Sequence, residues 1–265
     1  MPTRKLSYMS SSQIREIEKQ EAVLILPIGC VEQHGPVGYV GADAILAECV
    51  AERAAEALEH VYVAPPLWYG YTPYTAWPGT VTLRLETLQA LVHDVVFGYL
   101  AHGFRRLVIV NNHGPNEAAI EPVAREVREE YGLELAIVYP WRLASSLAKE
   151  KYPEMSGSFG HGGEPTISVM MALAPGVIDT SADVKRGYVK DGTAIDIVSY
   201  RSARFEGQEV GLFSDPTEIL PSGASGDWRH ASEEVGKAVL EDVVQFTIRF
   251  LEHFEKRPLP TEEEH

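Results

Sequence analysis

Short apolar runs rich in β-branched residues alternate with helical patterns along the first half of the chain, and this alternation constrains the fold more than any other feature. Strands are predicted at residues 22–28, 60–64, 107–111 and 135–139. Helices are predicted at residues 44–58, 86–101 and 117–131. Strands separated by helices at this spacing are typical of βαβ units. We therefore predict an α/β protein of three layers, with helices on both faces of a central, mostly parallel sheet.

The rest of the chain shows one more long helical pattern and three long loops. The helix is predicted at residues 232–255, with Ser232 as its N-cap. Segments rich in Pro, Gly and aromatic residues predict loops at residues 65–80, 139–163 and 207–226. Because the 265 residues contain neither an internal repeat nor a linker-like stretch, we predict a single domain over residues 1–265.

Charge and cysteine content indicate which partners and which cellular location to expect. The chain has 38 acidic and 23 basic residues, a formal net charge of −15. Such a field repels polyanions, so we predict binding to neither nucleic acid nor a membrane. No apolar stretch is long enough to span a membrane, and the N-terminus lacks the apolar core of a secretory signal. Cys30 and Cys49 have the surroundings of reduced core thiols, which predicts a cytoplasmic location.

Candidate metal ligands follow two of the predicted strands. Glu32 and His34 are two residues apart after the first strand, so an extended backbone directs both side chains the same way. Asp43 falls just before the helix predicted from residue 44, and His113 follows the strand at 107–111. Ligands bind beyond the carboxyl ends of parallel strands, and this donor set suits Zn, Mn or Fe. The alternatives are a helix cap for Asp43, a loop hydrogen bond for His113 and a solvated side chain for Glu32.

A third cluster lies in the glycine-rich segment GSFGHGGEPTISVMMAL. It places His161 and Glu164 at the start of an apolar helix, among glycines that allow the backbone to approach a ligand closely. We interpret both residues as candidate site residues. The alternatives are a buried turn donor for His161 and a first-turn acid stabilised by the helix dipole for Glu164.

These motifs resemble a known family. LPIGCVEQHGPVGYVGAD is similar to the opening signature of the creatininase (creatinine amidohydrolase) family. PPLWYGYTPYTAWPGTVTL, VNNHGPNEAAI, GHGGEPTISVMMAL and SGASGD resemble its later motifs, in the same order. The resemblance covers residues 26–227. It implies an α/β/α fold, a hydrolase with two divalent metal ions per chain, and a homohexamer.

The resemblance also implies roles for individual residues. Glu32 and His113 resemble ligands of the first metal, and His34 a ligand of the second. Asp43 resembles the carboxylate that bridges both ions, which are about 3.5–4 Å apart in such sites. His161 resembles the catalytic histidine, which passes a proton to the leaving nitrogen or carbon.

Four positions depart from the family pattern. Creatininase has a glutamate ligand two residues after the equivalent of His113, where this chain has Pro115. Proline has no ligating side chain, so Glu164 is the candidate replacement. Val37, Ala42 and Thr166 stand where the family has a histidine, a threonine and often an acidic residue. These changes argue against creatinine as the substrate but leave metal-dependent hydrolysis in place.

Aromatic residues gather in the loops that flank the predicted site: Trp68, Tyr69, Tyr71, Tyr74, Trp77 and Trp141. Packing within the protein or between subunits accounts for some of them. We predict that Tyr71, Trp77 and Trp141 form walls for a small substrate.

Three hypotheses for function follow. The first is a two-metal hydrolase that cleaves a C–N bond of a small cyclic or amide-like molecule with metal-activated water. The second is a hydrolase or isomerase acting on the ring of a keto-sugar or cyclitol, with C–C bond cleavage. The third is a non-catalytic metal-binding partner of another enzyme. Release of ammonia or an amine distinguishes the first from the second.

Overall fold

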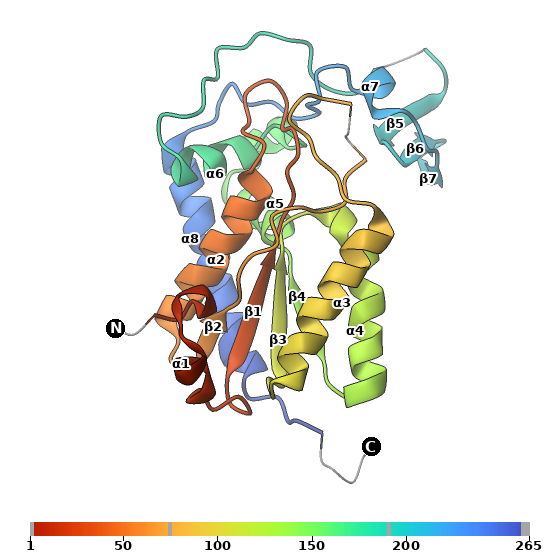
Figure 1. Cartoon of the computed structure of the whole chain (residues 1–265). Coiled ribbons are helices and arrows are strands. Elements are labelled where there is room, and N and C mark those ends of the chain that lie inside the picture. Colours follow the sequence, from red (N-terminus) through yellow and green to blue (C-terminus); the bar gives the residue numbers. More distant parts are fainter. Residues whose placement is uncertain (1–2, 74–75, 190–191, 261–265) are drawn as a thin grey trace.

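A parallel sheet of four strands forms the centre of the molecule (Figure 1). The computed structural model describes residues 3–73, 76–189 and 192–260. The sheet order is β2-β1-β3-β4, and every neighbouring pair is parallel. The strands are β1 (Val23–Ile28), β2 (Val61–Val63), β3 (Arg106–Asn111) and β4 (Leu135–Val138).

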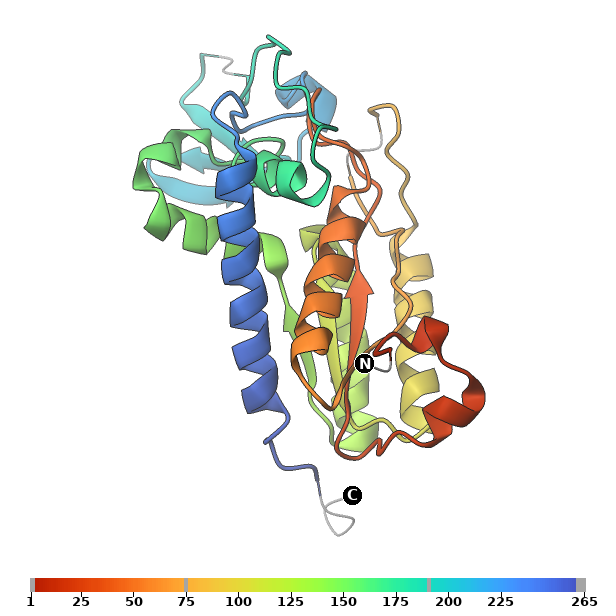
Figure 2. The same ribbon diagram turned by 90° about the vertical axis from the view of Figure 1, so that its left-hand side faces the viewer.

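Helices cover both faces of this sheet, which confirms the predicted three-layer fold. On one face lie α2 (Ala42–Ala57) and α8 (Glu233–Phe254), side by side along the strands (Figure 2). On the other lie α3 (Leu85–Ala101) and α4 (Glu117–Tyr131). Strand residues alternate between the two cores: Val23 and Ile25 pack with α2 and α8, and Leu24 with α3 and α4.

The segment at 139–163, predicted as a loop, contains a helix, so that prediction was wrong. Helix α5 (Pro140–Lys151) packs on α8 and is followed by the 3-10 helix η3 (Pro153–Ser158). Helix α5 begins with Pro140. Proline suits this position because it lacks a backbone N–H, and an N–H in the first turn has no partner within the helix. Ala144 and Ala148, four residues apart, form its buried stripe. The short helix α6 (Thr166–Leu173) then packs against α8.

A small antiparallel sheet stands above the carboxyl ends of the main strands (Figure 1). Its strands are β5 (Ile195–Ser199), β6 (Ser202–Phe205) and β7 (Gln208–Gly211), followed by α7 (Pro216–Ile219). The loop predicted at 207–226 was therefore also wrong. All four residues of β7 are exposed, so the strand carries no alternation of buried and exposed side chains.

The remaining elements are short, and two boundaries matter for the site. These elements are η1 (Leu6–Tyr8), α1 (Ser11–Arg15) and η2 (Gly114–Asn116). Helix α2 begins at Ala42, so Asp43 is its second residue rather than the residue before it. Ser232 caps α8 as predicted, accepting a hydrogen bond from the N–H of Val235 at 3.2 Å. Within the described ranges, no helix is long and apolar enough to cross a membrane.

Close packing of α6 against α8 depends on one glycine. A Cβ atom at Gly236 would lie 1.8 Å from the carbonyl oxygen of Ser168. The two backbones are therefore in direct contact at this point, and a methyl group there must push the helices apart.

We predict that Gly236→Ala lowers the free energy of unfolding by about 1–3 kcal/mol, because overpacking a close contact forces the backbone to shift. The matched control is Gly98→Ala on the exposed face of α3, where a Cβ meets nothing within 4 Å. That change should raise stability by roughly 0.5–1 kcal/mol through helix propensity. Urea unfolding measures the free energy of unfolding of both variants and of the parent. A Gly236→Ala protein as stable as the parent would contradict the close packing.

Candidate metal centre

The topology of the sheet brings the predicted metal ligands together. From β1 the chain leads to β2 at one edge of the sheet, and from β3 it leads to β4 at the other edge. A crevice forms where neighbouring strands diverge in this way, beyond their carboxyl ends. Ile28 and Asn111, the last residues of β1 and β3, are paired in register. The segments that follow them therefore lie side by side.

Two buried carboxylates lie at the centre of the site. Glu32, from the segment after β1, is 2% exposed, and Asp43, from the first turn of α2, is 1% exposed. The hydroxyl of Thr72 donates a hydrogen bond to Oε1 of Glu32. The indole N–H of Trp141 donates to Oδ1 of Asp43, where the side-chain amide of Asn112 also donates at 3.4 Å. Glu32 Oε2 and both oxygens of Asp43 face the histidines.

Two histidines point one ring nitrogen each at these carboxylates. His34 Nδ1 lies 3.0 Å from the carbonyl oxygen of Glu32, and His113 Nε2 lies 3.0 Å from that of Tyr71. A carbonyl oxygen only accepts, so both nitrogens carry the proton. The other ring nitrogens are His34 Nε2, 3.6 Å from Asp43 Oδ1, and His113 Nδ1, 3.0 Å from Asp43 Oδ2. Each of them donates to Asp43 when its ring is protonated and can bind a metal ion when its ring is neutral. Such anchoring orients histidines for metal binding.

His161 follows the same pattern. Its Nε2 donates to the carbonyl oxygen of Gln33 at 2.8 Å, which leaves Nδ1 as the unprotonated nitrogen, 4.0 Å from Glu32 Oε2. Its ring stacks on that of His34 with a centroid separation of 4.8 Å. The His161 side chain is 20% exposed, compared with 3–5% for Glu32 and His113. His161 is therefore at the open side of the site.

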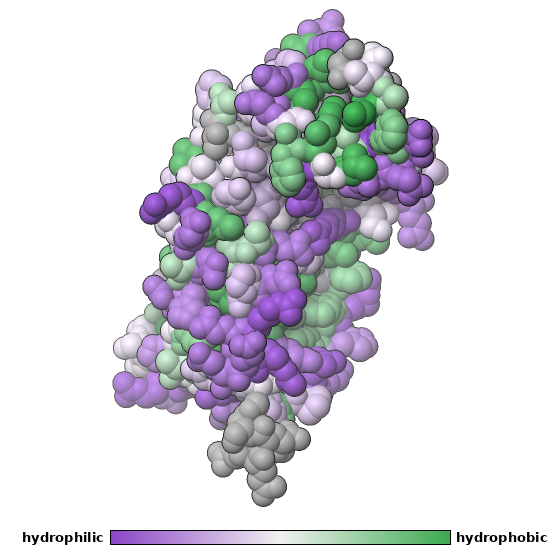
Figure 3. Space-filling model, turned by 90° about the vertical axis from the view of Figure 1, so that its right-hand side faces the viewer, coloured by the Kyte–Doolittle hydropathy of each residue, from purple (hydrophilic) through white to green (hydrophobic). Residues whose placement is uncertain are grey.

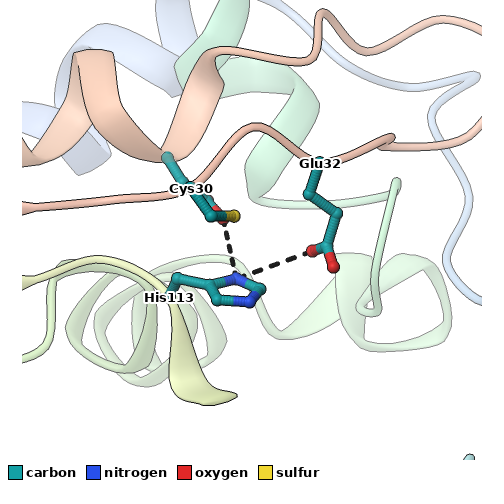
Figure 4. Close-up of side chains that lie close together, drawn as sticks. Cys30, Glu32 and His113 are labelled. Carbon is teal, nitrogen blue, oxygen red and sulfur yellow. Dashed lines mark hydrogen bonds and ion pairs between the residues drawn. The ribbon is translucent and has the colours of Figure 1, made fainter. Parts of the chain in front are cut away.

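The donor atoms form two overlapping groups in which all atoms lie within 4.8 Å of one another. Figure 4 shows Cys30, Glu32 and His113 pointing toward a common centre. The first group is Cys30, Glu32, Asp43 and His113; the second is Glu32, His34 and His161. Glu32 belongs to both, and Asp43 has one oxygen facing His113 and the other facing His34.

The charges in the site are strongly coupled. Burial alone would raise the pKa of Asp43, but the charge of His34 and hydrogen bonds from His113 and His34 hold it well below its usual value. Burial disfavours the charged forms of His34 and His113, yet Asp43 and Glu32 raise the pKa of both rings. For His161, burial and the neighbouring His34 lower the pKa. The Asp43 carboxylate is therefore ionised, and His161 is neutral at pH 7.

This arrangement fits a divalent cation. Buried carboxylates need a compensating positive charge, and the imidazole nitrogens that do not bind backbone carbonyls turn toward the carboxylate oxygens. Nitrogen, oxygen and sulfur donors in one cluster suit Zn and Fe, and the nitrogen and oxygen donors also suit Mn. In a three-layer α/β/α fold, a donor cluster beyond the carboxyl ends of the strands is typical of a metal-dependent enzyme.

Comparison with known proteins assigns the family. The family model described as creatinine amidohydrolase matches residues 7–251. The chain therefore belongs to the creatininase family, and it is a metal-dependent hydrolase. This confirms the resemblance found in the sequence motifs.

Relatives in this family have different substrates. The creatinine amidohydrolase of Pseudomonas putida is 29% identical over 85% of this chain and 86% of its own length. The 3-dehydro-scyllo-inosose hydrolase of Thermotoga maritima is 29% identical over 96% of this chain and 86% of its own length. Among solved structures, a creatininase variant of Zn–Zn type has a TM-score of 0.77 at 25% identity, covering 97% of this chain and all of that one.

Of the six predicted metal-binding and catalytic residues, the structure brings five together and leaves one apart. Glu32, His34, Asp43, His113 and His161 all belong to the two donor groups. Glu164 belongs to neither group. Its Oε1 accepts a hydrogen bond from Ser168 Oγ at 2.9 Å, and its Oε2 has no hydrogen-bond partner among the described residues. Its role as a replacement for the ligand missing at Pro115 stays a prediction that this geometry does not support.

The aromatic residues are placed unequally. Trp141 reaches the site, where its indole contacts Asp43. Tyr71 orients His113 through its backbone carbonyl, while its side chain packs against the core beside α3 and α4. Trp77 is half-buried in the loop before α3. Tyr74 lies outside the described residues. The role of Tyr71, Trp77 and Trp141 in substrate binding stays a prediction.

Sequence reasoning missed several residues of the site. The sequence pattern predicts only a core thiol at Cys30, and it gives no sign that Thr72, in a loop rich in aromatic residues, contacts Glu32. Gln33 is buried beside His161, and its amide donates to the carbonyl of Gly223 at 3.0 Å. Only the string GCVEQHG, which contains Cys30 and Gln33, carried a signal.

We predict an unusual pH dependence at Glu164. Burial raises its pKa from 4.5 to about 7 in the folded protein. Between these values the folded chain keeps a proton that the unfolded chain releases, so the free energy of unfolding falls as pH rises through this window. Metal-depleted Glu164→Gln should lack this loss. Its stability relative to the parent should rise by up to about 3 kcal/mol between pH 4 and pH 8.

Urea unfolding at several pH values measures this difference. Glu150→Gln, an exposed residue of α5, is the matched control and should leave the profile close to that of the parent. A Glu164→Gln profile parallel to that of the parent would contradict a protonated, buried carboxyl group.

Proposed function

We propose that this protein is a two-metal amidohydrolase that cleaves a C–N bond in a small cyclic or amide-like molecule. The observation that carries the proposal is the set of anchored histidines, each with one nitrogen on a backbone carbonyl and the other directed at Glu32 or Asp43. This arrangement orients metal ligands before any metal binds. Family membership supports the hydrolase class.

The ligand assignment rests on which atoms face one another. Glu32 and His113 would hold the first ion, and His34 the second. Asp43 would bridge them, because Oδ2 lies 3.0 Å from His113 Nδ1 and Oδ1 lies 3.6 Å from His34 Nε2. We propose Zn, Mn or Fe as the ions, two per chain.

The chain's own groups suit hydrolysis. Bound divalent ions polarise a carbonyl oxygen and lower the pKa of water at such a site. His161 is neutral and turns its unprotonated Nδ1 toward Glu32, so it can take a proton and pass it to the leaving nitrogen. The carbonyl of Gln33 keeps the ring in this tautomer. Partial exposure allows His161 to contact a substrate.

The residues beside Trp141 favour a substrate without strong negative charge. Arg142 is the basic residue next to Trp141, and its guanidinium donates to Glu117 Oε2 at 2.5 Å. Tyr139 donates to the other oxygen of Glu117 at 2.8 Å. Because Arg142 is already paired, we propose a neutral or weakly charged molecule that contacts Trp141, with Tyr71 and Trp77 as further walls.

A second candidate function is hydrolysis of a C–C bond in a keto-cyclitol. The relative named 3-dehydro-scyllo-inosose hydrolase aligns with 96% of this chain, more than creatinine amidohydrolase does. The same site could then stabilise an enediolate in place of a tetrahedral intermediate. The product separates the two reactions.

We also propose that the chain is a cytoplasmic homo-oligomer, a hexamer as in its family. Apolar side chains gather on the face of the small sheet (Figure 3). They are at least 38% exposed and include Ile195, Phe205, Val210, Leu212 and Phe213. A patch of this kind is typical of a contact surface, which supports association of identical chains.

We predict that hydrolysis requires two metal ions per chain. Chelation should abolish activity on a panel of cyclic amides, formamides and keto-cyclitols, and Zn, Mn or Fe should restore it. Elemental mass spectrometry should then find about two metals per chain. Release of amine or ammonia supports the C–N reaction, and a nitrogen-free ring-opened acid supports the C–C reaction. A metal-loaded protein inactive on the whole panel would favour the non-catalytic partner.

We predict different outcomes for two substitutions. Asp43→Ala should lose both metals, because it removes the bridging carboxylate. His161→Ala should lower kcat by about 10²–10⁴ and keep both metals, because it removes only the proton carrier. The exposed His230→Ala is the control and should match the parent in both measurements. Full metal content in Asp43→Ala would contradict the bridge, and loss of one metal in His161→Ala would make His161 a ligand.

A further inference from the structure

Cys30 lies directly among the groups that would bind the first metal. Its side chain is fully buried, two residues beyond the end of β1. Gly29 makes this placement possible, since a Cβ there would lie 2.3 Å from the backbone of Ala44. The strand end therefore touches the first turn of α2, and Cys30 Sγ comes within 2.9 Å of Asp43 Oδ2.

The four donors of this group lie close enough together to share one ion, since all four ligand atoms are within 4.8 Å of one another. Bonds of about 2.0–2.3 Å to a tetrahedral zinc place neighbouring ligands about 3.3–3.8 Å apart. His113 Nδ1 lies 3.6 Å from Glu32 Oε2 and 3.0 Å from Asp43 Oδ2, and Cys30 Sγ belongs to the same cluster. Figure 4 shows the sulfur directed into the space between Glu32 and His113. A small expansion accommodates an ion.

We propose that Cys30 is a thiolate ligand of the first metal, completing a four-donor set with Glu32, Asp43 and His113. This inference rests on the proposed metal-binding function. The second group offers only oxygen and nitrogen atoms, from Glu32, His34 and His161. The two positions therefore differ in chemistry. A thiolate favours Zn, Co or Fe over Mn, so the first position should select against Mn while the second does not.

A simpler role for Cys30 is a hydrogen bond from the thiol to Asp43 that only positions the carboxylate. Serine at this position keeps a donor of similar reach but removes the sulfur. The two roles therefore predict different results for Cys30→Ser. A positioning thiol is replaced by the hydroxyl with little change in metal preference, whereas a thiolate ligand is not.

The experiment is a titration of the metal-depleted full-length protein with Co²⁺ under reducing conditions, followed by near-ultraviolet absorption. A sulfur-to-cobalt charge-transfer band should appear as the first ion binds. Cys30→Ser should bind cobalt without this band, and its Zn²⁺ affinity should fall at least about 10-fold, the lower bound for losing an outer-shell partner. Its Mn²⁺ affinity should change less than its Zn²⁺ affinity.

The matched control is Cys49→Ser, a half-buried cysteine of α2 that belongs to neither donor group. This variant leaves Cys30 as the only cysteine of the chain and should keep the band. It therefore tests the thiolate ligand even if Cys30→Ser fails to fold. Bound cobalt without the band in Cys49→Ser, or a band retained in Cys30→Ser, would overturn the thiolate ligand and leave the metal centre standing. Failure of the parent to bind cobalt at all would overturn both the ligand and the proposed metal function.

Discussion

The burial of two carboxylates, Glu32 and Asp43, governs the structure around them. Removing two negative charges from water is costly unless positive charge and hydrogen bonds compensate. The protein meets this demand with His34 and His113, whose pKa values are raised by the neighbouring carboxylates. Each of the three imidazoles of the site is held by a backbone carbonyl and turns its other nitrogen toward a carboxylate. Trp141 and Thr72 donate hydrogen bonds to Asp43 and Glu32. The donor cluster thus suits a cation, and backbone carbonyls orient its imidazoles.

The fold supplies those backbone carbonyls at the right places. Parallel strands bring the segments after β1 and β3 together, and the loop before α3 passes beside them. Asn116 holds these pieces in register: its amide donates to the carbonyl of Gly29 at 2.9 Å, and its carbonyl oxygen accepts from the N–H of Tyr71 at 2.9 Å. Gln33 similarly joins His161 to the segment at Gly223: its backbone carbonyl accepts from His161 Nε2 at 2.8 Å, and its side-chain amide donates to the carbonyl of Gly223 at 3.0 Å. A few buried amides therefore fix the distances on which the metal centre depends.

Much of the fold could be predicted because its signals are local. The core strands are short, apolar and β-branched, and α4 forms over residues 117–131 as its pattern predicts. Prediction failed where the signal was weak or ambiguous. Proline and aromatic residues at 139–163 predicted a loop where α5 forms, although Pro140 suits the start of a helix. The exposed strand β7 has no buried face and is held by pairing with β6, which no local pattern reports.

For the site, the sequence by itself determined which chemical groups are present and, through motif order, that Glu32, His34, Asp43, His113 and His161 belong together. Only the tertiary structure decided which nitrogen of each ring binds a backbone carbonyl and which one faces a carboxylate, because that depends on carbonyls elsewhere in the chain. It also decided that Glu164 lies outside the donor groups and that Cys30 lies inside one. The reason is physical: ligand spacing of a few ångströms is set by how strand ends, helix starts and loops pack, and residue order does not encode those distances.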